Sequence, residues 1–573
     1  MPASIAKQNG DIGRKRQFQG GRGPKRQKTK KEKPVKEGGN EEVLLADVRA
    51  LFAAQKLSES HTVTNSPSAS NEVITVPITD DVNGVVKDED FTTNTDSGMP
   101  EVQLPEPFTE IDVKVLELSS TGDGLAVHPS SSQIYAVPFS VPGDTVRVKV
   151  IKHFTEHNYS MADFVSVVEP SPLRDDSRIR CQYFSQCGGC QFQMLDYPTQ
   201  LAHKKTIVEK AYKNFSQLPS EMYPIIGDTI GSPLQYEYRT KLTPHFDGPP
   251  SARRSDKKNG IKSVFKEVPP IGFMQKGRRT TIDIEDCPIG TDAVRMGMKR
   301  ERLRVADELE KYQRGATILL RESTKRLSND AKEAVEPQAD TIKKVTPEYT
   351  DLKTCMTDNN GFSTEYIDSF VFTNAAGSFF QNNNSILPNF TQYIRDHILP
   401  PATSDQPAIK YLIDAYSGSG LFTITLSSLF TSSTGIDIST ASIESARQNA
   451  VLNNLSPSQC TFIAADAPEL FKSVTYPNNE TVVVIDPPRK GCDESFLGQL
   501  LKFGPRRVVY VSCNVHTQAR DVGVLVRGMN TSGTKYKVES LRGFDFFPQT
   551  GHVEGVAVLS RVDAVEEPST TAQ

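Results

Sequence analysis

Residues 410–422 read Lys410-Tyr-Leu-Ile-Asp414-Ala-Tyr416-Ser-Gly418-Ser-Gly420-Leu-Phe. The apolar run predicts a buried strand, and the Gly-x-Gly that follows its acidic end predicts a tight turn before a helix. Glycines at such a turn let a ligand approach the backbone closely. A lone Gly-x-Gly is weak evidence, because dinucleotide-binding proteins share it. The stretch therefore predicts a ligand site and leaves the kind of ligand open.

Three more predicted strands downstream end in an acidic residue. Thr434-Gly-Ile-Asp437 is suited to a ribose diol, Cys460 to Asp466 to an adenine amino group, and Asp486 opens an Asp-Pro-Pro-Arg-Lys-Gly run. Ligands of open parallel sheets bind outside the carboxyl ends of the strands. From Ile409 onward the repeated strand, turn and helix pattern predicts an α/β, doubly wound, Rossmann-like domain.

The glycine pattern separates two classes of nucleotide-binding enzyme. A dehydrogenase would be expected to carry Gly-x-Gly-x-x-Gly, but Gly420 is followed here by Leu-Phe-Thr. The rigid Asp486-Pro-Pro at a strand end holds a carboxylate in a fixed pose beside the ligand. The sequence therefore favours an S-adenosylmethionine-dependent methyltransferase domain.

A fifth strand, Arg507 to Ser512, places Cys513 at the same edge of the predicted sheet. A buried structural thiol is the ordinary interpretation of a free cysteine, but polar Asn514 directly after the strand favours a reactive one. Farther on, Asp545-Phe-Phe-Pro-Gln-Thr-Gly-His552-Val-Glu554 supplies two titratable side chains before the last strand, where they could also merely cap it.

One methyl-transfer reaction would use all of these groups. Carbon 5 of uracil is a poor nucleophile, so its methylation needs a thiolate to add at carbon 6. The proton on carbon 5 must then be removed by a base before the thiolate leaves. Cys513 suits the first role and Glu554 the second, with His552 as the alternative base.

Taken together, these residues resemble the RNA 5-methyluridine methyltransferase family, in particular its eukaryotic, fungal-like tRNA branch, which acts on uridine 54 of the T-loop. The resemblance extends from about Ile111 to Val562 and implies Cys513 as nucleophile, Glu554 as base, and S-adenosylmethionine and tRNA as partners. The cofactor contacts that it implies are Gln381, Tyr416, Gly418, Gly420, Leu421, Asp437 and Asp486. Two positions depart from the family pattern: Val515 replaces the usual proline, and Ser417 a common cysteine.

A group of cysteines earlier in the chain could hold a metal. Cys181-x5-Cys187-Gly-Gly-Cys190 places three thiols within ten residues, and Cys287 offers a fourth. Four thiolates suit zinc or an iron–sulfur cluster. Some members of the resembled family hold a [4Fe-4S] cluster with this spacing, which favours iron–sulfur over zinc. Cys355, Cys460 and Cys492 have no predicted task.

The first 170 residues contain two contrasting segments. Residues 1–105 are polar and lack periodicity, which predicts a disordered tail apart from a short helix near Glu41 to Lys56. Basic runs at Arg14–Arg16 and Lys25–Lys31 are typical of a nuclear-import signal or an RNA-binding arm, though a solvated tail fits equally. Residues 106–170 alternate like strands of an all-β OB-type barrel, which resembles the TRAM RNA-binding module.

Residues 171–374 are predicted to form a mixed α+β central domain, residues 375–562 the methyltransferase domain, and residues 563–573 a polar tail. Within the central domain, Ser251–Lys266 and Arg314–Pro347 are predicted to be poorly ordered insertions, and Tyr238-Arg-Thr-Lys241 resembles an RNA-facing strand.

Composition limits the remaining choices. A chain of 573 residues is too long for a single hydrophobic core, so we expect several domains. The net charge of -4 does not indicate nucleic-acid binding by the chain as a whole. No apolar run approaches a membrane span, so we expect a soluble intracellular protein without a membrane or an obligate protein partner. The basic tail favours nucleus or cytoplasm over mitochondrion. Two alternatives stay open: the same chemistry on ribosomal RNA, or an RNA-binding protein whose methyltransferase site is idle.

Overall fold

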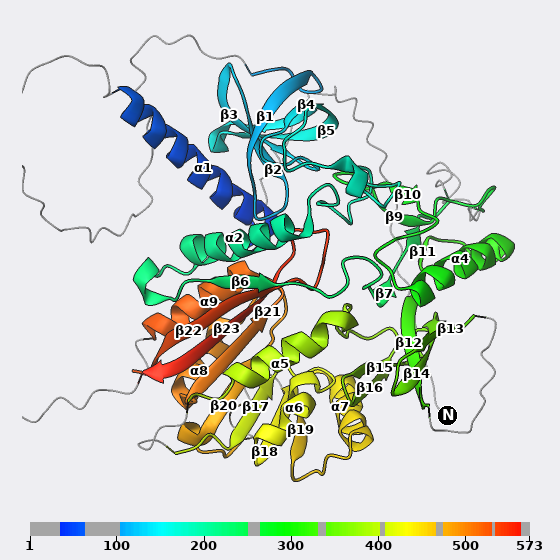
Figure 1. Cartoon of the computed structure of the whole chain (residues 1–573), viewed down its shortest axis with the longest axis vertical. Coiled ribbons are helices and arrows are strands. Elements are labelled where there is room, and N and C mark those ends of the chain that lie inside the picture. Colours follow the sequence, from blue (N-terminus) through cyan, green and yellow to red (C-terminus); the bar gives the residue numbers. More distant parts are fainter. Residues whose placement is uncertain are drawn as a thin grey trace, which may run out of the picture.

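A computed structural model describes residues 35–63, 104–249, 264–329, 340–401, 407–465, 471, 474–529 and 533–562. The predictions for residues 1–34, for the tail 563–573 and for Asp466 fall outside these ranges. A small barrel lies at one end of the molecule, a large sheet flanked by helices lies at the other, and smaller sheets extend to one side (Figure 1).

The barrel forms around buried side chains: residues 110–118 and 145–154 alternate buried valines with more exposed polar residues, so that one face of each of these two strands points inward. Its strands are β1 (Glu110–Leu118), β2 (Gly124–His128), β3 (Ser131–Val137), β4 (Thr145–Phe154) and β5 (Tyr159–Glu169). They close in the order β1-β2-β3-β5-β4. The OB-type all-β domain predicted from the sequence is confirmed.

The large sheet is the doubly wound α/β domain that the sequence predicted. Its order is β19-β18-β17-β20-β21-β23-β22-β6. The strands are β6 (Gly227–Ile230), β17 (Tyr411–Ala415), β18 (Ser432–Asp437), β19 (Cys460–Ala464), β20 (Thr481–Ile485), β21 (Arg507–Ser512), β22 (Lys535–Phe544) and β23 (Glu554–Val562). The five from β19 to β21 run parallel, and β23 lies antiparallel to both of its neighbours.

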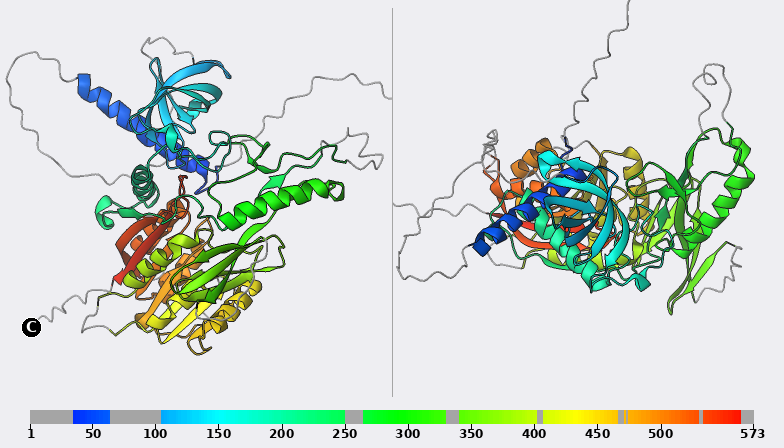
Figure 2. Two further views of the ribbon diagram at one scale, coloured as in Figure 1. Left: turned by 45° about the vertical axis from the view of Figure 1, so that its right-hand side comes forward. Right: turned by 90° about the horizontal axis from the view of Figure 1, so that it is seen from above.

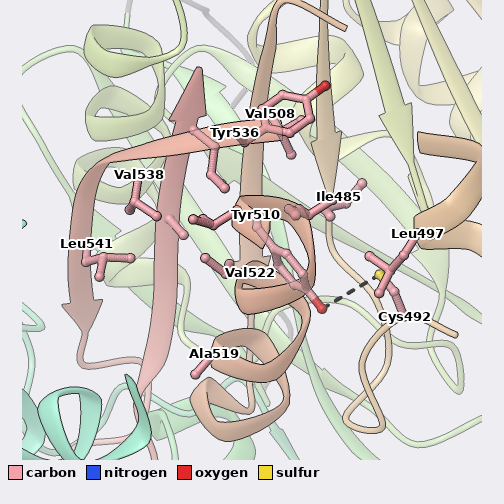
Figure 3. Close-up of a cluster of buried hydrophobic side chains, with 14 of the residues drawn as sticks. Ile485, Cys492, Leu497, Val508, Tyr510, Ala519, Val522, Tyr536, Val538 and Leu541 are labelled. Atoms are coloured by element: carbon pink, nitrogen blue, oxygen red, sulfur yellow. Dashed lines mark hydrogen bonds between the residues drawn. The ribbon is translucent and has the colours of Figure 1, made fainter. Parts of the chain in front are cut away.

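Helices cover both faces of this sheet because its central strands are apolar on both sides. One face carries α2 (Tyr197–Phe215), α8 (Glu494–Phe503) and α9 (Val515–Arg527), and the other α5 (Leu387–His397), α6 (Leu421–Thr425) and α7 (Thr440–Leu452). Along β21, Tyr510 packs into the first core, whereas its neighbours Val509 and Val511 pack into the second. Figure 3 shows Tyr510 against Val522 and Val538, its hydroxyl 3.7 Å from Cys492 Sγ.

The central residues form two four-stranded sheets and a hairpin, in the orders β10-β9-β8-β11, β13-β14-β12-β7 and β15-β16. Their elements are β7 (Lys241–Leu242), β8 (His245–Phe246), β9 (Gly272–Met274), β10 (Thr281–Asp283), α4 (Asp292–Asp307), β11 (Ala316–Thr317), β12 (Leu320–Ser328), β13 (Ile342–Val345), β14 (Tyr349–Met356), β15 (Phe362–Ile367) and β16 (Phe370–Ala375). The prediction of poor order over 314–347 is wrong for β11, β12 and β13, which pair within these sheets.

Two elements from the range predicted to be the central domain belong structurally to the C-terminal one. Strand β6 pairs in parallel with β22, and α2 packs against α9. In Figure 2 the helix α2 accordingly lies beside the C-terminal sheet rather than among the green central strands. The large sheet is therefore completed by a strand that lies far before its other strands in the sequence.

The short helix expected near Glu41 to Lys56 within the polar N-terminal segment is present, and it is longer than expected. Residues 40–63 form the helix α1 (Asn40–Val63), and Val43, Val48 and Asp47 on it are buried. Figures 1 and 2 show α1 lying between the barrel and the α2 side of the C-terminal domain. Within the described ranges, no helix has the length and apolar character needed to cross a membrane.

Candidate active site

One cavity of about 1080 Å³ opens at the carboxyl edge of the large sheet and reaches the central sheets. It is lined by residues that follow all five parallel strands, as expected where the strand ends meet. Of the predicted site residues it brings together Gln381, Tyr416, Gly418, Leu421, Asp437, Asp486, Cys513 and Glu554, with Cys181, Cys187, Cys190 and Cys287.

The turn after β17 forms one side of this cavity. Tyr416 and Gly418 both have positive φ, 64° and 53°, and a Cβ on Gly418 would meet no atom within 4 Å. The Gly418 amide donates to Asp437 Oδ2 at 3.0 Å, and the Ser439 amide donates to Oδ1 at 2.7 Å. The turn therefore leaves open space beside a carboxylate held in place by two backbone amides.

Gly420 lies behind this turn and not on the cavity. Its φ is +92°, and a Cβ there would come within 3.1–3.3 Å of Ile424, Phe462 and Ala446. Glycine is needed at this position for close packing of the helix against the sheet. Asp414 is also structural: its buried Oδ2 accepts bonds from the amide and the hydroxyl of Thr423 in α6.

Cys513 occupies the junction between β21 and α9. Its neighbour Asn514 is the N-cap of α9, accepting at its side chain from the His516 amide. The Cys513 side chain is half-buried and faces the cavity. Because a helix N-terminus carries partial positive charge, this position favours the thiolate form of a cysteine.

The charges around Cys513 oppose that preference. Burial, followed by the Glu554 and Asp486 carboxyls, raises the pKa of the Cys513 thiol to about 12, whereas Arg489 lowers it. Burial and then Asp414 raise the pKa of Asp486 to about 7. Burial, with Asp486 adding to it, holds the pKa of Glu554 well above its usual range, and Arg489 acts against this. Three titratable groups and one arginine therefore set one another's protonation.

Glu554 is better placed than His552 to accept a proton in the cavity. Glu554 is buried at the start of β23, where its raised pKa makes it a stronger base than an exposed carboxylate. The His552 side chain is exposed, and its Nδ1 lies 3.2 Å from the Arg489 guanidinium. A ring nitrogen that accepts from a guanidinium has its lone pair engaged.

The loop that precedes Glu554 is held by residues that the sequence reasoning missed. Buried Lys204 donates to Asp545 Oδ1 at 2.5 Å, to the Phe547 carbonyl at 3.0 Å and to the His552 carbonyl at 2.7 Å. Gln200 exchanges bonds with the Gln549 backbone and side chain. A lysine in an amphipathic helix gives no sequence signal of such a role, since it is normally solvent-facing.

The strand predicted to face RNA is largely used inside the protein. Tyr238 is buried and donates to the Pro548 carbonyl at 3.1 Å, and Lys241 donates to the carbonyls of Gly377 and Ser378. Of this group, Tyr238 and Arg239 line the cavity, whereas Thr240 and Lys241 do not. These contacts make the strand a support for the two loops that flank the site.

The four predicted metal ligands line one cavity, but within the described ranges their side chains are not grouped as a metal site. All four thiols line the cavity, and burial together with the nearby Cys181 and Cys187 raises the pKa of the Cys287 thiol to about 12. Among the residues that the structure describes, no three His, Cys, Asp or Glu side chains form a group that could hold a metal ion. The other predicted bystanders, Cys355, Cys460 and Cys492, are buried.

Comparisons with known proteins bear on both ends of the chain. The sequence profile of the TRAM domain matches residues 106–165, and that of tRNA (Uracil-5-)-methyltransferase matches residues 362–562. The chain is 45% identical over 458 residues to the tRNA (uracil(54)-C(5))-methyltransferase of Schizosaccharomyces pombe, covering 80% of this chain and 79% of that protein. It is 40% identical over 491 residues to the protein of the same name from Saccharomyces cerevisiae, covering 79% and 73%.

A solved structure shares the architecture. It is the Pyrococcus abyssi tRNA (uracil-54, C5)-methyltransferase in complex with S-adenosyl-L-homocysteine, with a TM-score of 0.53 and 24% sequence identity. The match covers 78% of this chain and all of that one. At this identity the likeness concerns the fold alone.

Proposed function

Because this chain belongs to the tRNA (uracil-5-)-methyltransferase family, we propose that it transfers a methyl group from S-adenosylmethionine to carbon 5 of uridine 54 in tRNA. One observation carries the proposal for the site. The Cys513 thiol and the Glu554 carboxyl face the same cavity as the Tyr416–Asp437 side, close enough for the carboxyl to raise the thiol's pKa. The proposed nucleophile, the proposed base and the proposed cofactor-binding residues therefore line the same cavity.

Cys513 acts as the nucleophile. It enters as the thiolate and adds to carbon 6 of the uracil ring, which moves electron density onto carbon 5. The N-terminus of α9 and the Arg489 guanidinium favour the thiolate at this position. Carbon 5 can then attack an electrophilic methyl group held beside it.

Glu554 completes the reaction as the general base. After transfer it takes the proton from carbon 5, the ring regains its double bond, and the Cys513 thiolate leaves carbon 6. One proton per turnover then passes from Glu554 to solvent. Asp486 beside it keeps a second buried carboxyl in the site, which raises the proton affinity of Glu554.

The residues along the β17 turn fit the cofactor. Open space at Gly418 accommodates a close ligand, the fixed Asp437 carboxylate can accept from a ribose diol, and the Tyr416 ring stands at the cavity. Gln381 and Leu421 line the same space, whereas Gly420 supports the turn from behind. When bound, S-adenosylmethionine supplies a methyl group on a sulfonium.

The barrel supports tRNA as the substrate. OB-type barrels hold single-stranded or looped nucleic acid, and this one carries the TRAM profile. A uridine stacked within its loop must turn outward to reach Cys513, at a cost of about a few kcal/mol. A placement in nucleus or cytoplasm rests on the N-terminal basic runs and stays a prediction.

The experiment is covalent trapping. Wild type with 5-fluorouridine-substituted tRNA and S-adenosylmethionine is expected to give a slow-migrating protein–RNA band on a denaturing gel, because fluorine cannot leave carbon 5 as a proton does. Cys513→Ala should give none. Glu554→Gln, a near-isosteric change, should accumulate the same band with ordinary tRNA, since only removal of the carbon-5 proton is blocked.

The outcomes separate the alternatives. A band with ribosomal RNA and not with tRNA would identify ribosomal RNA as the substrate. No band with either RNA would mean that the methyltransferase site is idle. A band that survives Cys513→Ala would remove the nucleophile assigned here.

A [4Fe-4S] cluster on Cys181, Cys187, Cys190 and Cys287, with zinc as the alternative, stays a prediction that rests on their spacing and on the gathering of the four thiols. The folded arrangement does not by itself support it. Protein purified without oxygen should contain about four irons per chain and absorb near 400 nm if the prediction holds. Stoichiometric zinc, or metal content unchanged by Cys190→Ser, would reject the iron cluster.

A further inference from the structure

The segment Val35–Val48, named here the N-terminal strap, spans from the Cys513 turn to the barrel and lies outside both matched profiles. We propose that the strap is a positioning element for the nucleophile: it fixes the turn that carries Cys513 and joins that turn to the RNA-binding barrel. The catalytic role of the strap rests on the proposed function, whereas its effect on the Cys513 turn is tested separately.

One end of the strap is bonded to the residue after the nucleophile. Asn514 Nδ2 donates to the Gly38 carbonyl at 3.0 Å and to the Arg489 carbonyl at 2.9 Å. Asn514 Oδ1 meanwhile accepts from the His516 amide. This one side chain therefore ties together the strap, the Asp-Pro-Pro-Arg loop and the start of α9.

A second contact holds the same end. Glu37 pairs with Arg520 of α9 at 3.0 Å, and Arg520 also donates to the Lys490 carbonyl at 3.0 Å. Gly38 has a φ of +64°, and a Cβ on it would lie 2.3 Å from Thr517 Cγ2. Only glycine lets the strap approach α9 this closely.

The other end of the strap is buried against the barrel. Asp47 Oδ2 accepts from the Ser120 amide at 2.5 Å, and both residues are buried. Leu45 and Val48 pack with barrel residues in one apolar cluster. The strap therefore connects two domains through a fixed polar contact and an apolar one.

The barrel turn that Asp47 holds returns to the active-site loop. Gly122 in this turn lies against Gly551. A Cβ added to Gly551 would lie 3.3 Å from the Cα of Gly122. Gln191 donates to the Thr121 carbonyl at 2.8 Å and accepts from the Gly551 amide at 3.0 Å. The strap thus contacts the nucleophile turn directly and the loop before Glu554 through the barrel.

Between these contacts the strap encloses space beside Cys513. A second cavity of about 230 Å³ is lined by Lys36 and Gly38 of the strap, by His516 and His552, and by Cys513 itself. Cys513 faces both this cavity and the large one. The strap therefore forms one wall of a cavity that opens onto the Cys513 side chain.

The Cys513 turn has a local reason to need support. Val515 is the first residue of α9, a position at which proline would preset the backbone and valine does not. Asn514 is extended, with φ -138° and ψ 95°, and so lies outside the helical region that a following proline disfavours. A proline at 515 would therefore supply by covalent restraint what the strap supplies by contact.

The test uses the full chain and Gly38→Ala, which forces the strap away from Thr517 without changing a residue of the large cavity. Amide hydrogen exchange of the segment Ser512–Thr517 is expected to become about fivefold to tenfold faster, the effect of losing roughly one hydrogen bond. Arg49→Ala, on the exposed face of α1, is the matched control and should leave exchange unchanged. Adding Val515→Pro to Gly38→Ala should restore slow exchange.

Exchange at Ser512–Thr517 that stays at the wild-type rate in Gly38→Ala, or that proline fails to slow, would overturn the proposal. Binding of S-adenosylmethionine, whose predicted residues lie away from the strap, serves as the check that the variant is folded. If Gly38→Ala does not fold, Glu37→Gln removes only the ion pair with Arg520 and is read in the same way.

Covalent trapping with 5-fluorouridine tRNA then connects the strap to the reaction. Gly38→Ala should slow adduct formation by a factor similar to that seen in exchange, and Val515→Pro should recover it. Absence of the adduct in wild type would count against the proposed function, while the exchange result would still decide the positioning role. Faster exchange with wild-type adduct formation would overturn the link to catalysis.

Discussion

Among single residues, Cys513 shows how position and charge act against each other. The start of α9 favours its thiolate, but burial and two carboxyls favour the neutral thiol, so its pKa is raised to about 12. Only a small fraction of the thiol is ionised near neutral pH. Arg489 lowers this pKa and is therefore a determinant of the reactivity of the Cys513 thiol.

The reactivity of the Cys513 thiol should respond in opposite directions to two substitutions. Arg489→Met removes the charge that lowers the pKa, so alkylation by iodoacetamide at pH 8 should slow by about tenfold for each unit of further rise. Glu554→Gln removes a carboxyl that raises the pKa and should speed alkylation. Mass spectrometry of the Cys513 peptide across pH 7–10 measures both rates, and Lys502→Met on the exposed end of α8 is the control. Equal rates in all four proteins would contradict this electrostatic account.

At the scale of elements, α2 is the support of the loop that delivers Glu554. Lys204 binds one carboxylate and two carbonyls of the segment Asp545–His552, and Tyr197 donates to the other oxygen of Asp545 at 3.0 Å. Both members of the Lys204–Asp545 pair are fully buried. The helix thus fixes the loop by polar contacts inside the protein, where water does not compete.

Replacing Lys204 by methionine should destabilise the fold by about 3–5 kcal/mol, because it leaves the Asp545 carboxylate buried without its partner. The double variant Lys204→Met/Asp545→Asn should recover most of this stability, since neither charge remains. It should still form the RNA adduct slowly, because the Phe547 and His552 carbonyls have lost their donor. Urea unfolding measures the first effect and trapping the second. Full recovery of both would show that Lys204 has only a structural role.

For the molecule as a whole, the sequence could predict what local patterns determine. Strand-end residues such as Asp437, Asp486 and Cys513 were placed at one edge because the carboxyl ends of parallel strands meet there. The barrel followed from alternation and turn residues. These inferences need no knowledge of which distant segments pack together.

Contacts between distant segments could not be predicted in this way. Nothing in the pattern around Lys204 indicates Asp545, and nothing near Gly38 indicates Asn514. The sequence predicted a short helix near Glu41 to Lys56 but not its docking, because the apolar residues Leu45 and Val48 become buried only against the barrel. The tertiary partner supplies the missing information in each case.

The position of β6 in the large sheet has a consequence for how the protein is made. This strand leaves the ribosome early, yet its partner β22 is among the last segments to be synthesised. At about 5–20 residues per second, β6 and α2 wait on the order of tens of seconds for the strands they cover. A nascent chain stopped before α9 and β22 therefore exposes both the apolar face of α2 and an unpaired strand, so that unfinished products are natural substrates for chaperones and proteases.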